Sequence, residues 1–205
     1  GVKGVLFNVW APKALSVSVV GEFNKYDGRV HLMERIEDTG VFELFIPGLA
    51  AGCGYMYEIK RQGKGTTRKL DPVSRQISSV PITASVVSDE NMPDSYAWND
   101  GLWMIKRKKE AGKKKPVTVY EVSLTDWLKE KSADELVDFV KQEGYTHVCF
   151  LPVAEYLNEE MNGYSTLGYF TVTHRIGGSD AFKKLVDDCH NAGIGVIIDW
   201  NGAYF

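Results

Sequence analysis

The chain has 205 residues, of which 44% are hydrophobic and 25% are charged, a composition typical of a globular protein with room for one or two hydrophobic cores. Its formal net charge of −3 argues against a polyanionic partner such as nucleic acid. No apolar run reaches the roughly 18 residues that a bilayer-spanning helix needs, so we expect no membrane partner.

Residues 1–95 predict short strands separated by turns. β-branched and aromatic runs of five or six residues end at Gly, Pro or Asp, and at least one of them alternates with period two. The four clearest runs are residues 5–10, 15–19, 41–46 and 55–59. No helical period interrupts them. This pattern favours an all-β, immunoglobulin-like sandwich of antiparallel strands over residues 1–95.

Residues 96–116 predict a connector. They contain the turn-forming Asn99-Asp100-Gly101 sequence, Pro116 and a strongly basic run at 106–115. That run holds seven Lys or Arg and one Glu, a net charge of +6. Basic residues are not spread over the rest of the chain, so a solvated linker is a better interpretation than a nucleic-acid surface.

From residue 117 strands alternate with helices. Apolar strands are expected at 117–122, 145–151 and 194–198, with helices opened by Ser132, in a capping box with Glu135, and by Ser179. Strands that are apolar on both faces and alternate with helices indicate a parallel sheet. A complete (β/α)8 barrel needs about 250 residues. Only 89 residues remain from 117 to 205, so 117–205 fits the first part of such a barrel, about three β/α units.

Two carboxylates follow the predicted parallel strands. Glu155 lies just past the second strand, and Asp199 lies at the carboxyl end of the third. The catalytic face of a barrel is built from the loops at these ends, which favours a functional role. By position alone, either residue could equally be a carboxylate that caps a loop.

Cysteine and histidine usage predicts neither a metal site nor a disulfide framework. Cys53, Cys149 and Cys189 are odd in number and have no short metal-type spacing, and the four histidines form no cluster of ligands. We therefore expect no cofactor and no metal. Because no secretory signal opens the chain, we expect a reducing, cytoplasmic compartment. The chain starts at Gly1 rather than Met, so we expect that this residue is not the natural start.

Several segments, in order along the chain, resemble the glycogen-branching enzymes of the α-amylase superfamily, glycoside hydrolase family 13. Asn162-Gly163-Tyr164-Ser165-Thr166-Leu167-Gly168-Tyr169-Phe170 is similar to a Trp-Gly-Tyr-x-x-x-Gly-Tyr-Phe segment of these enzymes. Residues 187–200 resemble the stretch that leads into the first conserved region of the superfamily, and residues 120–127 resemble the first barrel strand. Residues 7–12 and 19–28 resemble the amino-terminal family 48 carbohydrate-binding module.

The resemblance implies an α-glucan partner and assigns roles to three residues. Tyr164 matches the tyrosine that stacks under glucose at the cleavage subsite, and Asp199 matches a supporting aspartate. Tyr26 falls where related modules carry an aromatic residue that stacks on glucan. The nucleophile and the acid/base of the superfamily follow barrel strands four and five. We therefore expect no catalytic residue in this chain, and we expect a monomer that is the amino-terminal fragment of a 1,4-α-glucan branching enzyme of glycogen biosynthesis.

Three positions depart from the family pattern. Tyr204 stands where the family has a sugar-binding His, Tyr156 where a His usually follows the Glu, and Asn162 where a Trp precedes Gly-Tyr. These changes suit one alternative, a non-catalytic glucan-binding or scaffold protein derived from such an enzyme. Another α-amylase-superfamily member with the same front module, such as a debranching enzyme, is the other alternative.

Overall fold

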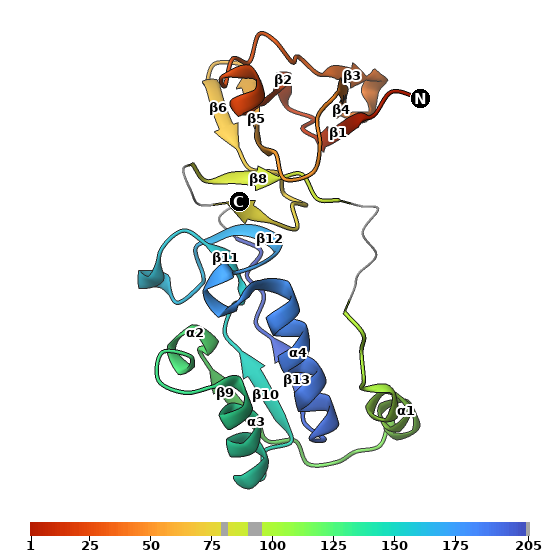
Figure 1. Cartoon of the computed structure of the whole chain (residues 1–205), viewed down its shortest axis with the longest axis vertical. Helices are drawn as coiled ribbons and strands as arrows, with labels where there is room; N and C mark the ends of the chain where they lie inside the picture. Colours follow the sequence, from red (N-terminus) through yellow and green to blue (C-terminus); the bar gives the residue numbers. More distant parts are fainter. Residues whose placement is uncertain (79–81, 90–95, 204–205) are drawn as a thin grey trace. The chain divides into compact units, whose positions relative to one another are not determined.

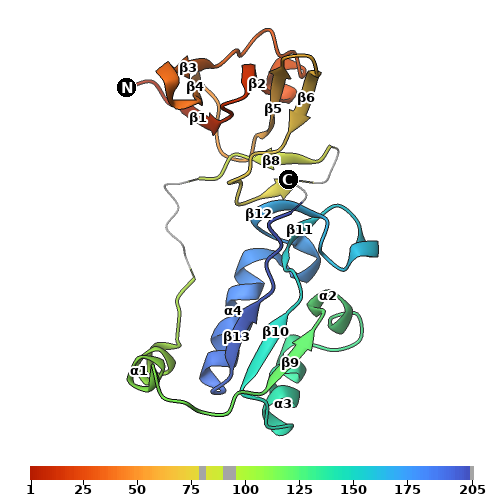
Figure 2. The same cartoon turned by 180° about the vertical axis from the view of Figure 1, so that it is seen from behind.

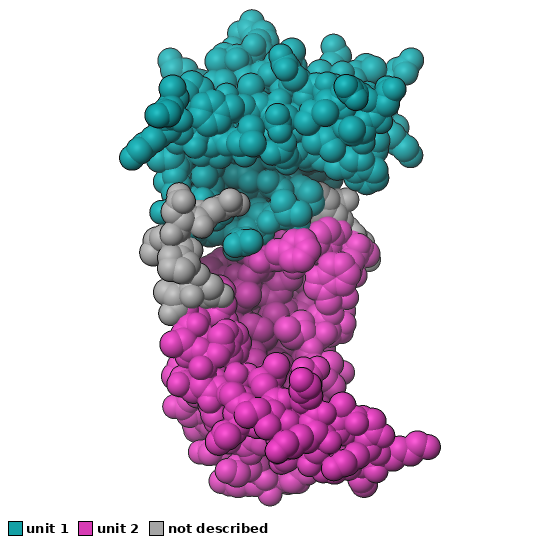
Figure 3. Space-filling model, turned by 90° about the vertical axis from the view of Figure 1, so that its right-hand side faces the viewer, with its two compact units in different colours: residues 1–92 teal, residues 93–205 magenta. Residues whose placement is uncertain are grey.

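The computed structural model describes residues 1–78, 82–89 and 96–203 (Figure 1). The chain divides into two compact units, Gly1–Met92 and Pro93–Phe205, which Figure 3 draws in teal and magenta. Each unit has a hydrophobic core, and the two cores have no described residue in common. Each unit is therefore organised around its own packing.

The first unit is a β-sandwich of antiparallel strands. One sheet has the order β1-β4-β3, with bounds Gly4–Trp10, Val41–Pro47 and Glu34–Ile36. The other sheet has the order β2-β5-β8-β7, with bounds Ala14–Val20, Gly54–Arg61, Ala84–Val86 and Ile77–Ser78, and β6 (Gly65–Lys69) pairs with β5. Alternate residues of both sheets, such as Phe7 and Val17, meet in one buried cluster, because successive side chains on a strand point to opposite faces. The predicted β-sandwich is confirmed.

The segment predicted as a connector, residues 96–116, carries more structure than a solvated linker. It contains helix α1, Gly101–Glu110, whose basic residues are exposed. The backbone N–H of Asn99 donates to Asp187 at 3.0 Å, and Asp100 lies 2.7 Å from the His190 ring. The side chains of Asp187 and His190, which are remote in the sequence, provide this anchor, so the local sequence of the segment does not reveal it.

The second unit contains a three-stranded parallel sheet, as the sequence predicts. The order is β13-β10-β9, with bounds Gly195–Ile198, His147–Phe150 and Val119–Val122. Helices α3 (Ala133–Gln142) and α4 (Gly178–Asn191) cover one face of this sheet, as Figure 2 shows from behind. Strands β11 (Ala154–Tyr156) and β12 (Thr166–Val172) form a separate antiparallel pair, and the short helix α2 (Leu124–Trp127) follows β9.

The two predicted helix starts have different outcomes. At α3, the Ser132 backbone N–H donates to Glu135 at 2.7 Å and the Glu135 N–H donates to the Ser132 hydroxyl at 3.2 Å, so the capping box is confirmed. At α4 the predicted cap Ser179 is wrong, since the helix already begins at Gly178 after Gly177. Gly177 has φ +89, a left-handed backbone that glycine adopts without a steric penalty.

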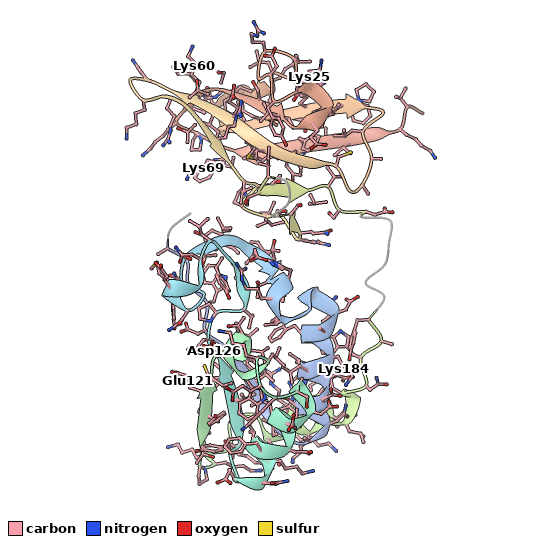
Figure 4. The ribbon with its side chains drawn as sticks, turned by 60° about the vertical axis from the view of Figure 1, so that its left-hand side comes forward. Lys25, Lys60, Lys69, Glu121, Asp126 and Lys184 are labelled. Atoms are coloured by element: carbon pink, nitrogen blue, oxygen red, sulfur yellow. The ribbon has the colours of Figure 1, made fainter. Side chains whose placement is uncertain are left out.

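The parallel sheet has one packed face and one open face in this unit. Val122, Val148 and Phe150 point into the core beneath α3 and α4. On the opposite face Cys149 lies in register between Glu121 and Ile197, and Ile197 is 40% exposed. Figure 4 shows Glu121 on β9 and Lys184 on α4, on opposite sides of the sheet. Among the described residues, every helix is too short or too polar to cross a bilayer.

Candidate functional site

Tyr26 lies on a tight turn of the first unit. The turn follows η1, Glu22–Asn24, and the buried Asn24 side chain holds it by accepting from the Gly21 N–H at 3.0 Å. Lys25 and Tyr26 have φ values of +53 and +58, a left-handed conformation that is uncommon for residues other than glycine. Such strain persists where the surrounding structure fixes it, and it gathers at functional positions.

Arg68 on β6 fixes the position of Tyr26. Its Nη2 donates to the Tyr26 carbonyl at 3.0 Å, and its guanidinium lies 5.7 Å from the Tyr26 ring centroid. Arg68 Nε also donates to Glu58 at 3.1 Å. Tyr26, Arg68 and Glu58 thus form a half-exposed group of an aromatic ring, a cation and a carboxylate. Arg68 is 42 residues from Tyr26, so sequence reasoning did not find it.

Tyr164, which the resemblance assigns to the cleavage subsite, and Asp199, which it assigns as a supporting aspartate, are in direct contact. The Tyr164 hydroxyl donates a hydrogen bond to Asp199 Oδ2. This bond, together with burial and the nearby carboxylates Asp199 and Glu121, raises the pKa of Tyr164 to about 12. Because its pKa is raised, the phenol stays protonated at neutral pH. Both side chains are half-exposed, so the ring remains accessible.

The backbone on both sides of this contact is also fixed. Asp199 continues β13, since its N–H donates to the Phe150 carbonyl at 2.9 Å. Asn201 Nδ2 donates to the Tyr164 carbonyl at 2.6 Å. Gly163, directly before Tyr164, has φ +86, and a Cβ there would lie 2.7 Å from the Pro152 carbonyl oxygen. Sequence reasoning did not single out Asn201, whose position two residues after Asp199 was the one available signal.

Glu155 is held by hydrogen bonds from the residues that follow β12. Its buried carboxylate accepts from Thr173 Oγ1 at 3.1 Å, from the His174 N–H at 3.1 Å and from Arg175 Nη1 at 2.6 Å. Burial alone would raise its pKa, but hydrogen bonds from His174 and from the Tyr156 N–H hold the pKa below its ordinary value. Of the two interpretations of this strand-end carboxylate, the geometry favours loop capping, because both oxygens are engaged.

The positions that depart from the family pattern have different surroundings. Tyr156 is buried, and the Arg175 guanidinium lies 4.2 Å from its ring centroid. Asn162 has φ +47 and lines a cavity of about 290 Å³ with Tyr156 and Arg175. Tyr204 lies outside the described residues.

A larger cavity of about 990 Å³ lies in the first unit between β1 and residues 71–75 and 86–89, and Tyr26 does not line it.

Within residues 1–78, 82–89 and 96–203, no group of three or more His, Cys, Asp or Glu could hold a metal ion. The two candidate sites consist of aromatic rings and hydrogen-bonding groups. An aromatic face beside carboxylates and amides suits a neutral polyhydroxylated ligand, whose ring stacks while its hydroxyls form hydrogen bonds.

Comparison with known proteins gives concordant matches to a family model, to curated relatives and to a solved structure. Residues 1–74 match carbohydrate-binding module 48, the isoamylase N-terminal domain family. The whole chain is 43% identical to 29% of the 1,4-alpha-glucan branching enzyme GlgB of Gloeobacter violaceus, and it is 43% identical to 29% of GlgB of Methylococcus capsulatus. In structure, 98% of the chain matches 32% of a putative alpha amylase from Salmonella typhimurium, with a TM-score of 0.67 and 24% identity.

The chain thus spans less than a third of the length of the curated relatives it matches. At 24% identity, the structural match shows a shared fold. The matches to the branching enzymes extend over both units, whereas the match to the carbohydrate-binding module lies in the first unit. The chain therefore corresponds, over its whole length, to the amino-terminal region of the 1,4-α-glucan branching enzymes, and it opens with a family 48 carbohydrate-binding module.

Proposed function

We propose that this chain supplies the glucan-binding module and the first part of the catalytic barrel of an enzyme that branches glycogen. Such an enzyme cleaves an α-1,4-glucan and transfers the segment to a 6-hydroxyl by retaining chemistry. The observation that carries the proposal is the Tyr164–Asp199 hydrogen bond. It joins two residues 35 positions apart, of which the family resemblance assigns Tyr164 to the cleavage subsite and Asp199 to a supporting role.

The barrel assignment is supported by the parallel sheet. β9, β10 and β13 are parallel neighbours, and α3 and α4 cover the same face, as successive β/α units of a barrel require. Asp199 follows directly on the carboxyl end of β13, the end at which barrel enzymes carry their active sites. We propose residues 1–95 as the module, 96–116 as the anchored connector and 117–205 as the beginning of the barrel.

In this proposal Tyr164 stacks on glucose and Asp199 orients the phenol. A stacked ring contributes through its face, so a hydroxyl engaged with Asp199 leaves the stacking surface available. Tyr26, with Arg68 beneath it, provides a second glucan contact on the module. We place the protein in the cytoplasm as a monomer with α-glucan as its partner. All three cysteines are free thiols, as suits a reducing compartment.

The module site predicts weak glucan binding that depends on Tyr26. The protein should be retarded in native gels containing glycogen, and Tyr26→Ala should weaken binding on the order of 10-fold, because one ring–sugar stack is lost. Trp10→Ala is the matched control, since Trp10 is 71% exposed on the other sheet of the sandwich. Retardation that is unchanged in Tyr26→Ala would place the binding site elsewhere on the module.

The chain alone should neither branch nor hydrolyse amylose. A retaining mechanism needs two carboxyl groups about 5 Å apart across the bond that is cleaved. Glu155 is occupied by Thr173, His174 and Arg175, and Asp199 is occupied by Tyr164. Iodine staining and reducing-end release from amylose measure the two activities. Activity that exceeds an Asp199→Asn control would mean that the chain carries a catalytic pair of its own.

A further inference from the structure

Residues 96–99 attach to α4 through one buried carboxylate. Asp187 is 3% exposed and accepts from the Tyr96 hydroxyl at 3.1 Å, from the Asn99 backbone N–H at 3.0 Å and from Asn99 Nδ2 at 3.2 Å. Burial alone would raise the pKa of Asp187, but the hydrogen bonds from Asn99 and Tyr96 hold it below its ordinary value. The charged carboxylate is therefore the form that holds this segment.

A second contact lies on the same side of α4, three residues further along. His190 Nδ1 is 2.7 Å from Asp100 Oδ2, and its ring stacks on Trp103 with centroids 5.0 Å apart and an interplanar angle of 15°. Residues at i and i+3 share one face of a helix, so Asp187 and His190 form one continuous docking strip. The segment that lies along this strip ends in the first turn of α1.

Polar contacts dominate this attachment. No described residue between 96 and 116 belongs to the hydrophobic core of the second unit or packs against it, and α1 buries none of its residues. Leu102 is 83% exposed. A segment that contributes no apolar burial to a core opens at a lower free energy than the core itself unfolds.

We propose that residues 96–110 form a strap that releases from Asp187 and His190 while the parallel sheet and its helices stay folded. When the strap is docked, the stretch between its attachment to α4 and β9 consists of the residues from the end of α1 to the start of β9. When the strap is released, residues 96–110 are added to this stretch. The reach of a flexible chain grows roughly as the square root of its length. The strap thus sets the length of the tether that enters β9. This proposal does not depend on glucan binding or on branching.

Amide hydrogen exchange of the full chain tests the strap, with the Asn99 N–H as the reporter of docking. In the unaltered protein, Asn99 and the amides of α1 should exchange through a smaller opening than the amides of Leu136 in α3 and Val148 in β10. Asp187→Ala should accelerate Asn99 exchange on the order of 10- to 100-fold and leave Leu136 and Val148 unchanged, because hydrogen bonds to a carboxylate are lost.

The matched control is Asp188→Ala on the same helix. Asp188 pairs with Lys184 at 2.6 Å, and Figure 4 labels Lys184 on α4. Loss of the Asp188 carboxylate should therefore leave Asn99 exchange unchanged. Asn99→Ala, followed through the Ile105 amide, removes a contact from the strap side without altering α4. The proposal is overturned if Asn99 and Val148 exchange through one common opening, if Asp187→Ala leaves Asn99 unchanged, or if both variants expose Val148.

Discussion

Replacing Glu155 with glutamine should lower the free energy of unfolding of the second unit by about 3 kcal/mol, because removing one partner of a buried ion pair leaves the other uncompensated. Glu155 is 4% exposed and accepts from Arg175 at 2.6 Å and from Thr173 at 3.1 Å. A glutamine has the same shape, but its NH2 group would face these donors in place of an acceptor.

Urea unfolding followed through the amide signals of β10 measures this effect. Asp126→Asn is the matched control, because Asp126 is an exposed carboxylate whose Lys129 partner, at 2.8 Å, is exposed as well. An exposed pair of this kind contributes about 0–1 kcal/mol. Equal losses in the two variants would show that the Glu155 cluster does not stabilise the unit.

The pH dependence of the same variant has a definite sign. The pKa of Glu155 is lower in the folded protein than its ordinary value, so the folded state favours the ionised carboxylate. Its contribution is therefore complete above the unfolded pKa of about 4.3 and is lost as the pH falls through the lower folded pKa. The Glu155→Gln variant should lack this part of the acid destabilisation, which identical acid titrations of both proteins would reveal.

The second large effect is expected in the module, where Asp71→Ala should cost about 2–4 kcal/mol. The Asp71 carboxylate accepts from the Tyr55 hydroxyl at 2.6 Å, from the Tyr57 hydroxyl at 3.3 Å and from the Val73 N–H at 2.9 Å. Both tyrosines are buried, so the substitution removes the acceptor of the Tyr55 hydroxyl and of the Val73 N–H, whereas the Tyr57 hydroxyl keeps the Asn8 carbonyl at 3.3 Å. Burial and the Asp71 carboxylate also raise the pKa of both tyrosines.

Chemical unfolding followed through the amides of β2 and β5 measures the cost. Asp38→Asn, at an exposed carboxylate of η2 (Glu37–Thr39), is the control and should change stability by less than about 0.5 kcal/mol. A Tyr55→Phe, Tyr57→Phe, Asp71→Ala triple variant should recover part of the loss, because no hydroxyl is then left unpaired. Failure of this recovery would mean that the cost arises from the cavity rather than from the hydrogen bonds.

The sequence predicts those strands that have an apolar face. β1, β2, β4 and β5 overlap the four predicted runs, because each contains apolar residues that are buried in the sandwich. β6 escaped prediction because its sequence Gly-Thr-Thr-Arg-Lys offers only one half-buried residue, Thr67. Its place is fixed by pairing with β5, and such long-range pairing leaves little trace in the local sequence.

The candidate sites were predictable in part for the same reason. The place of Asp199 follows from its position after an apolar strand, whereas its hydrogen bond with Tyr164, 35 residues earlier in the chain, was not predicted. The role of Glu155 could not be assigned from its position, because the residues that bind it, Thr173 to Arg175, follow β12 in the sequence. The anchor of the connector escaped prediction because Asp187 is 88 residues from Asn99. The local sequence does not distinguish Asp187 from the other carboxylates of its helix.

The separate hydrophobic cores determine how mutations combine in this protein. The hydrogen bonds of Asp71 all join residues of the first unit, and those of Glu155 all join residues of the second. Substitutions that share no partners have additive effects, whereas neighbours within one network couple by about 0.5–3 kcal/mol. We therefore expect substitutions in the Asp71 network and in the Glu155 network to combine additively, so the two networks can change on independent evolutionary courses.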